Sequence, residues 1–190
     1  MADGTLKVGT ITTSSGSGTI TLGQSGETLS IPSGATITNS GTATGFGGDN
    51  TPAFKAKLSA TQSISNATTT KIDFDSEMFD TNNSYDPTTN QRFTVPSGEA
   101  GKYVICSQVY FDDVASTDAT RLIYIYKNGY EFLASNIRTV GTTGRGQVVR
   151  ISDLIELSVG DYIEIFGYTN AGATNIGTGS TRFYGYKIIE

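Results

Sequence analysis

The sequence contains no histidine and no tryptophan, and only one cysteine and four prolines occur among its 190 residues. Without histidine, the side chain that most often carries protons near pH 7 is missing, so Ser/His/Asp and Cys/His catalytic groups are excluded. One thiol and no imidazole are too few ligands for an ordinary tetrahedral zinc site. We therefore expect a protein that is not an enzyme and has no cofactor.

Basic residues are also scarce. The chain has 13 Lys and Arg against 18 Asp and Glu, a net charge of −5, and no basic patch along the sequence. Phosphate binding needs concentrated Lys and Arg, so nucleic acid is excluded as a partner. The single cysteine, Cys106, cannot form an internal disulfide, and its place in an apolar strand predicts a buried, inert thiol.

Long apolar segments are absent as well. No apolar run approaches the roughly 20 residues needed to span a bilayer, so we expect no membrane insertion. Residues Met1 to Gly4 have neither the basic nor the apolar part of a secretory signal. We therefore expect synthesis in a cytoplasm.

The chain divides by composition near residue 50. Residues 1–50 hold 18 Ser and Thr and 11 of the 23 glycines, and Phe46 is their only aromatic residue. Such a segment cannot bury enough apolar surface to form its own core. We predict an extended arm over 1–50, ending in a hinge at 41–50, and a folded head over 51–190.

The arm is patterned rather than random. Short apolar pairs recur between Gly, Ser and Thr, which predicts tiny strands that each show one apolar face. Such a strip becomes stable only when other copies or a host surface cover it, and a flexible tether is the alternative. The predicted docking residues are Leu6, Val8, Ile11, Ile20, Leu22, Leu29, Ile31 and Ile37.

From Thr51 onwards, short strand-like runs follow one another with turn signals between them and no helical period. In 103–111, alternate side chains form an apolar face that could line a core. Residues 121–126 are apolar on both faces and should form an inner strand, which Asn128-Gly129 closes as a hairpin turn. The pattern predicts an all-β sandwich or jelly roll.

Aromatic side chains are placed beyond the needs of a core. In 161–168, Ile163 and Ile165 alternate with bulky groups, so the aromatic residues stand outside if the isoleucines point inward. A contiguous aromatic surface indicates association, although these tyrosines could also cap the sandwich ends of a monomer. The predicted interface, to which Phe183 would add, consists of Tyr162, Phe166, Tyr168, Tyr184 and Tyr186.

Carboxylates are the remaining candidates for chemistry. Asp73 and Asp75, or Asp112 and Asp113, formally suit a glycosidase pair. Asp73 and Asp75 project to one face of a strand, and a solvated outer face is the alternative that we prefer. Asp112, Asp113 and Asp118 share a loop that could hold calcium. Their spacing matches no fixed calcium loop, so we expect a polar loop and no metal.

Several segments of the head together resemble one family. They run in that family's order over about residues 52–190, and they are Ala53–Ala56, Phe93–Pro96, Gly101–Tyr103, Leu122–Gly129, Leu154–Phe166 and Thr181–Tyr186. Their succession resembles the C1q domain, a jelly-roll relative of the tumour-necrosis-factor (TNF) fold. The resemblance implies tight homotrimers with aromatic side chains at the threefold axis, and some family members bind calcium in the head.

The arm is similar to the Gly/Ser/Thr-rich leaders of small structural proteins of tailed phages, above all in Thr28–Ile37. The two resemblances imply a non-enzymatic virion protein made in the host cytoplasm. In this interpretation a homotrimer docks on a capsid protein, or another virion component, through its arm. It would act as a decoration or cement protein or as a head fibre.

Two alternatives remain. A tail-fibre or receptor-binding tip would recognise a host surface glycan or protein through loops at 112–120, 138–147 and 169–180. A secreted C1q-like signalling or defence lectin is disfavoured by the missing signal peptide and the missing collagen-like Gly-X-Y stalk.

Overall fold

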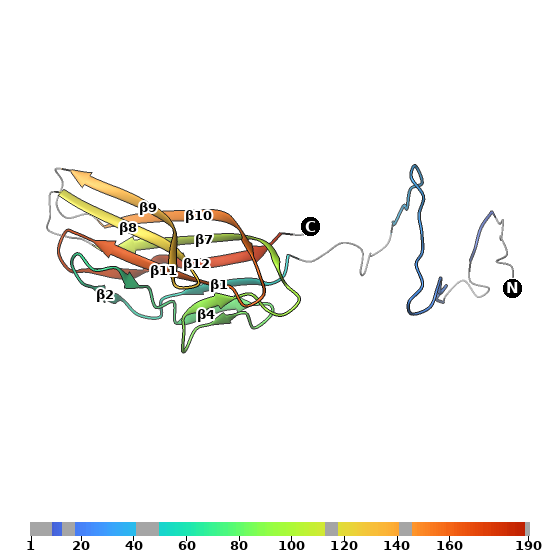
Figure 1. Ribbon diagram of the computed structural model, residues 1–190, viewed down its shortest axis with the longest axis horizontal. Helices are drawn as coiled ribbons and strands as arrows, with labels where there is room; N and C mark the ends of the chain where they lie inside the picture. Colours follow the sequence, from blue (N-terminus) through green and yellow to red (C-terminus); the bar gives the residue numbers. More distant parts are fainter. Residues whose placement is uncertain (1–8, 13–17, 41–49, 113–117, 141–145, 189–190) are drawn as a thin grey trace. The chain divides into compact units, whose positions relative to one another are not determined.

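A computed structural model of the 190-residue chain describes residues 9–12, 18–40, 50–112, 118–140 and 146–188. The chain forms two compact units, Met1–Thr44 and Gly45–Glu190. The first unit lies within the predicted arm, and the second contains the predicted head (Figure 1). Within the described residues, no helix is long and apolar enough to cross a membrane.

Within residues 9–12 and 18–40, the arm consists of extended chain and two tight turns. The amide of Glu27 donates to the carbonyl of Gln24 at 3.0 Å, and the amide of Ala35 donates to the carbonyl of Pro32 at 3.1 Å. The Glu27 carboxylate also accepts the amide of Gln24 at 2.7 Å. No strand forms within 9–12 or 18–40, so the short apolar pairs of the arm do not pair with one another there.

The described part of the head contains twelve strands in two six-stranded sheets, and every paired strand is antiparallel to its partner (Figure 1). Sheet A has the order β10-β7-β12-β1-β4, and β2 pairs with β12. Sheet B has the order β5-β6-β11-β8-β9, and β3 pairs with β11. The strands are β1 Ala53–Lys57, β2 Gln62–Ile64, β3 Thr70–Lys71, β4 Ser76–Asp80, β5 Tyr85–Asp86, β6 Arg92–Thr94, β7 Gly101–Phe111, β8 Asp118–Lys127, β9 Tyr130–Val140, β10 Gln147–Leu157, β11 Tyr162–Thr169 and β12 Thr174–Lys187.

The core lies between the sheets, where alternation along the strands places it. Every second residue of β7 from Tyr103 to Phe111 is buried, as the sequence predicted. Ile163 and Ile165 of β11 point inward and are fully buried. The prediction of an inner strand at 121–126 is also confirmed, because β8 lies between β11 and β9.

Aromatic rings pack together around Phe54 in one part of the core. The ring of Phe54 stacks on those of Tyr85 and Phe93, with centroids 5.2 and 4.7 Å away, and meets Phe183 edge-on at 4.9 Å. Burial raises the pKa of the Tyr85 hydroxyl, which donates to the carbonyl of Phe74 at 2.9 Å. The prediction that Phe183 adds to an outer aromatic surface is wrong, because its position on β12 points into the sandwich.

The predicted Asn128-Gly129 turn is confirmed. Both residues have positive φ, 54° and 81°, as a two-residue hairpin with the right-handed twist of its strands requires. The Asn128-Gly129 turn is joined to the segment just before β11, because the Asn128 side chain donates to Asp161 Oδ1 at 2.7 Å. Asp161 also accepts the amide of Ser158 at 2.9 Å and pairs with Lys127 Nζ at 3.0 Å.

These contacts predict an acid-sensitive step in stability. The hydrogen bond from Asn128, with those from Ser158 and Lys127, lowers the pKa of Asp161 from 3.8 to about 2. A carboxyl with a lower pKa in the folded chain stabilises the fold above the unfolded value, and that stabilisation is lost as the pH falls through the folded value. The free energy of unfolding of the wild type should therefore fall more steeply between pH 4 and pH 2 than that of Asp161→Asn. Denaturant titrations across that range measure the difference, and parallel curves would contradict the assignment.

Candidate functional site

The outer surface of sheet A, which we call the A face, carries exposed apolar side chains. Tyr184 and Tyr186 of β12 are 37% and 38% exposed, and Leu154 of β10 is 52% exposed. Strand register places Val104 of β7 between Leu154 and Tyr186, which continues the apolar row. Phe79 of β4, also exposed, lies opposite Lys55 on the same face.

A shallow hollow lies in the A face beside Tyr184. Its lining includes Cys106, Gln108, Arg150 and Ser152. Burial raises the pKa of the Cys106 thiol, although its hydrogen bond with Tyr184 acts in the opposite direction. The sequence predicted a buried, inert cysteine; Cys106 is instead half-buried and faces outward, and its raised pKa favours the neutral thiol.

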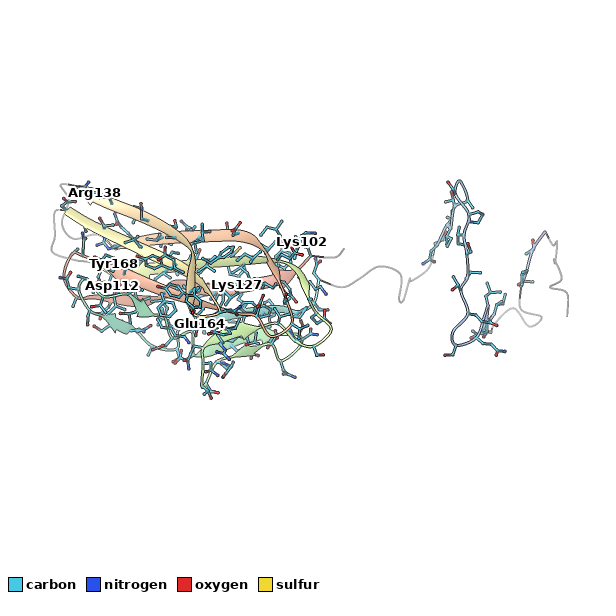
Figure 2. All side chains as sticks on the ribbon, viewed as in Figure 1. Lys102, Asp112, Lys127, Arg138, Glu164 and Tyr168 are labelled. Atoms are coloured by element: carbon cyan, nitrogen blue, oxygen red, sulfur yellow. The ribbon has the colours of Figure 1, made fainter. Side chains whose placement is uncertain are left out.

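The outer surface of sheet B, which we call the B face, carries a separate aromatic group. Phe166 of β11 packs on Tyr126 of β8, with ring centroids 4.2 Å apart, and Tyr126 meets Tyr124 edge-on at 6.1 Å. Tyr162 and Tyr168 lie on the same outward side of β11 as Phe166 (Figure 2 labels Tyr168). All five rings are half-buried. Contacts between rings join Phe166, Tyr126 and Tyr124, whereas Tyr162 contacts Arg92.

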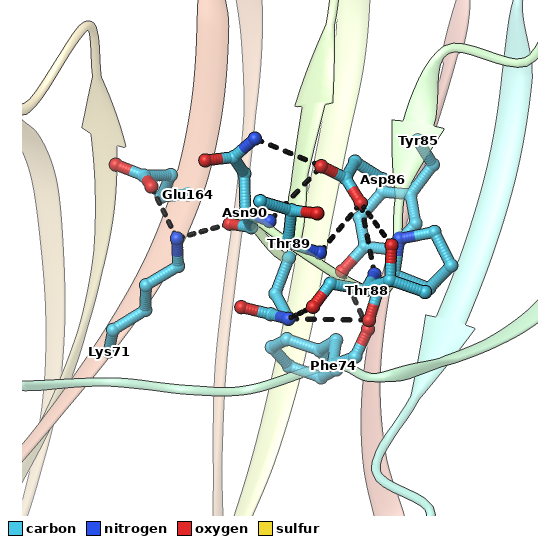
Figure 3. Close-up of polar contacts among 10 residues, drawn as sticks. Lys71, Phe74, Tyr85, Asp86, Thr88, Thr89, Asn90 and Glu164 are labelled. Atoms are coloured by element: carbon cyan, nitrogen blue, oxygen red, sulfur yellow. Dashed lines mark hydrogen bonds and ion pairs between the residues drawn. The ribbon is translucent and has the colours of Figure 1, made fainter.

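Charged groups border the B face. Lys71 of β3 contacts Glu164 at 2.5 Å and donates to the carbonyl of Asn90 (Figure 3). The loop that positions Asn90 is held by Asp86, whose carboxylate accepts the amides of Thr89 at 2.9 Å and Asn90 at 3.1 Å. The hydrogen bond from the Thr89 amide foremost, with those from Thr88 and the Asn90 side chain, lowers the pKa of Asp86. The Arg92 guanidinium lies 4.1 Å from the centre of the Tyr162 ring.

The five residues predicted as one interface therefore occupy two surfaces. Tyr162, Phe166 and Tyr168 belong to the B face, whereas Tyr184 and Tyr186 belong to the A face on the other side of the sandwich. The predicted interface omits Tyr124 and Tyr126, because the apolar residues on both faces of 121–126 predict only an inner strand. Their alternation with buried Ile123 and Ile125 was the signal that placed them outside.

The candidate calcium ligands do not form a cluster in the described part of the head, where no group of three or more Asp, Glu, Cys or His suits a metal. Asp118 accepts two hydrogen bonds from Arg138, at 2.9 and 3.0 Å, which lower its pKa. The amide of Asp112 donates to the carbonyl of Asn175. Figure 2 places Asp112 and Arg138 toward the same end of the head. Asp113 lies outside the described residues.

The carboxylates of Asp73 and Asp75, one of the formal glycosidase pairs, accept hydrogen bonds from different residues. Burial raises the pKa of Asp73, which accepts a hydrogen bond from the Gln62 side chain at 3.1 Å. Burial also acts to raise the pKa of Asp75, but hydrogen bonds from Ser59 outweigh it and lower the pKa. Both side chains are exposed on the segment that leads into β4.

The loops predicted for receptor recognition are shorter than expected. Residues 169–180 mostly belong to strands, because β11 ends at Thr169 and β12 begins at Thr174. The other two predicted loops, 112–120 and 138–147, overlap strands β8, β9 and β10, and their central parts lie outside the described residues.

The arm presents its aliphatic side chains to solvent. Between 42% and 65% of the surface is exposed at each described member of the predicted docking set, namely Ile11, Ile20, Leu22, Leu29, Ile31 and Ile37. Leu6 and Val8 lie outside the described residues. Apolar side chains with this exposure need a covering surface to be stabilising.

No protein-family model and no curated protein sequence matches the chain. Solved structures do match, and each covers 72% of this chain. Eiger TNF from S. frugiperda has 12% identity and a TM-score of 0.51 over 91% of its own chain. The globular domain of zebrafish complement 1qA protein has 15% identity and a TM-score of 0.52 over 97%, and murine APRIL has 14% and 0.52 over 98%. The likeness, with the two antiparallel sheets, confirms the predicted all-β jelly roll of the C1q/TNF type.

Proposed function

We propose that this protein is a non-enzymatic structural protein of a tailed-phage virion, a homotrimer that docks on the capsid through its arm. There it acts as a decoration or cement protein or as a head fibre, and the head is displayed outward. The observation that carries the proposal is the combination of a jelly roll that has its own hydrophobic core with an arm whose described aliphatic side chains are exposed. The similarity of the arm to phage leaders supports the choice of partner.

The A face is the surface best suited to the trimer contact that the C1q resemblance implies. Tyr184, Tyr186 and Leu154 are exposed on one face, and the hollow beside Tyr184 can receive a side chain of a neighbouring copy. Exposed aromatic and aliphatic groups gathered in this way are typical of association surfaces. The five aromatic residues of the B face described above are less exposed.

The arm supplies the energy for docking. Full burial of one Leu or Ile side chain contributes about 1.5–3 kcal/mol. The described part of the arm carries six such exposed side chains. Three arms joined through one trimer bind together, which raises the effective affinity without new contacts. A trimer at a junction between capsid subunits would stabilise the assembled shell by mass action.

A tail-fibre or receptor-binding tip is the second candidate. The observation that favours it is the aromatic B face, which the proposed trimer contact leaves open. In that case the head recognises a host surface glycan or protein, and the arm attaches to the tail instead of the shell.

Substitution in the arm tests the docking proposal. We expect Leu29→Asp combined with Ile31→Asp to reduce attachment at least tenfold, because two exposed aliphatic side chains are replaced by charges that cannot be buried unpaired. The measurement is co-sedimentation of purified protein with particles grown without it. The matched control is Ser30→Asp, which adds a charge between the same two positions and should attach normally. Undiminished attachment of the double variant would rule out docking through 29–31.

A further inference from the structure

The B face contains a preformed aromatic platform, which we define as Tyr124, Tyr126, Tyr162, Phe166 and Tyr168. Three of its members come from β11 and two from β8, and register places Phe166 directly opposite Tyr124. From Tyr162 to Tyr168 the platform extends roughly 20 Å along β11, at about 3.3 Å per residue. It is therefore long enough for several units of a chain-like ligand.

Three of the five platform rings, those of Phe166, Tyr126 and Tyr124, hold one another in place before any ligand arrives. Phe166 and Tyr126 are tilted by 33° with centroids 4.2 Å apart, and Tyr124 stands at 87° to Tyr126. Mutual packing leaves little side-chain freedom to lose, so binding costs little conformational entropy. Four of the five members are tyrosines, which place hydroxyl donors and acceptors beside the apolar ring faces.

The charges around the platform balance. Lys71 is paired with Glu164, Arg92 lies over Tyr162, and Glu131 of β9 stands opposite Tyr126 in the strand register. Two cations and two anions thus border the rings, and the Lys71–Glu164 pair remains partly accessible, at 25% and 12%. A surface with this balance does not select a charged ligand, but it can donate and accept hydrogen bonds.

We propose that the platform binds a neutral oligosaccharide of pyranose units. A pyranose ring has an apolar C–H face surrounded by hydroxyl groups, so it can stack on Phe166 and Tyr126 while its hydroxyls bond to Glu164, Lys71 and the tyrosine hydroxyls. This ligand matches both the apolar ring faces and the neutral, hydrogen-bonding border. The site adds a recognition activity to the proposed structural role, and it does not require capsid docking.

Other ligand classes fit the B face less well. A protein partner would need side chains that protrude or pockets that receive its anchors, whereas the platform rings are half-buried. A nucleic acid could stack on aromatic rings, but the net charge of −5 opposes its phosphates.

The test uses the full-length chain on an array of neutral oligosaccharides, with β-1,4-linked glucose and N-acetylglucosamine oligomers among them and sialylated glycans as the anionic comparison. The ligand that binds best is then titrated by calorimetry. We expect a neutral ligand whose affinity changes less than twofold between 0.05 and 0.5 M NaCl, because screening acts on charge pairs. Binding to no neutral glycan, or to anionic glycans or host proteins alone, would overturn the proposal.

Two variants locate the binding on the platform. Phe166→Leu keeps the volume at a half-buried position but removes the ring, and we expect at least a fivefold loss of affinity. Tyr126→Ala removes the packed partner and should cost at least tenfold. The matched control is Tyr130→Ala, at the start of β9, where a tyrosine that is 79% exposed lies outside the platform. Equal affinity in the wild type and both platform variants would overturn the assignment, and the sedimented mass of each variant confirms that it is folded and assembled.

Discussion

Replacing Tyr186 by aspartate is expected to convert the proposed trimer, of about three times the 20.1 kDa chain mass, into a monomer. Tyr186 lies in the apolar row of the A face with Val104 and Leu154 on the neighbouring strands. A carboxylate there would be buried in each of three copies without a designed partner, and the desolvation penalty is several kcal/mol per ion. Sedimentation equilibrium on the full chain measures the mass.

The matched control is Phe166→Asp, which places the same charge on the B face. We expect this variant to remain trimeric and to keep its β-sheet content, because its carboxylate stays in contact with water. The opposite pattern, with Phe166→Asp monomeric and Tyr186→Asp trimeric, would contradict the choice of the A face. The trimer contact would then include Phe166, as the sequence pattern predicted.

The second large effect is expected in the core. Phe54→Ala should lower the free energy of unfolding by about 3–5 kcal/mol, because it removes a ring that is only 1% exposed and leaves a cavity. The neighbouring rings of Tyr85, Phe93 and Phe183 lose their common packing partner. Urea unfolding followed by circular dichroism, at one fixed protein concentration, measures the change.

Phe132→Ala is the control for the core prediction. Phe132 of β9 is 47% exposed, so its truncation should change the free energy of unfolding by about 0.5 kcal/mol or less. A Phe54→Ala variant as stable as Phe132→Ala would contradict the packing described for the core.

Much of the fold could be read from local patterns. The alternation in β7 and β11 identifies which side chains are buried, because successive residues of a strand point to opposite faces. The Asn-Gly pair specifies its hairpin through positive φ at both residues. These features depend on neighbours in the sequence, so one sequence is enough to predict them.

The arrangement of the surfaces could not be read in this way. β11 and β12 follow each other in the chain and have similar aromatic alternation, yet β11 pairs with β8 in sheet B and β12 pairs with β7 and β1 in sheet A. Those pairings join residues far apart in sequence, and no local pattern specifies them. The predicted interface was therefore divided between two faces, and Phe183 was assigned to the wrong side.

The partners of polar side chains also could not be predicted from the sequence. Asp118 is a candidate calcium ligand in isolation, but strand pairing brings Arg138 of β9 beside it and occupies its carboxylate. The charge balance around the aromatic platform also depends on β3 and β6 reaching β11. The composition gives the number of charged residues but not their positions in the fold.

Immunogold labelling tests whether this protein belongs to a virion. Intact particles from the source are labelled with antibody raised against residues 51–190, the predicted head. We expect gold distributed over the capsid shell. Gold confined to the tail would support the receptor-binding alternative, and particles without any label would contradict the virion assignment altogether.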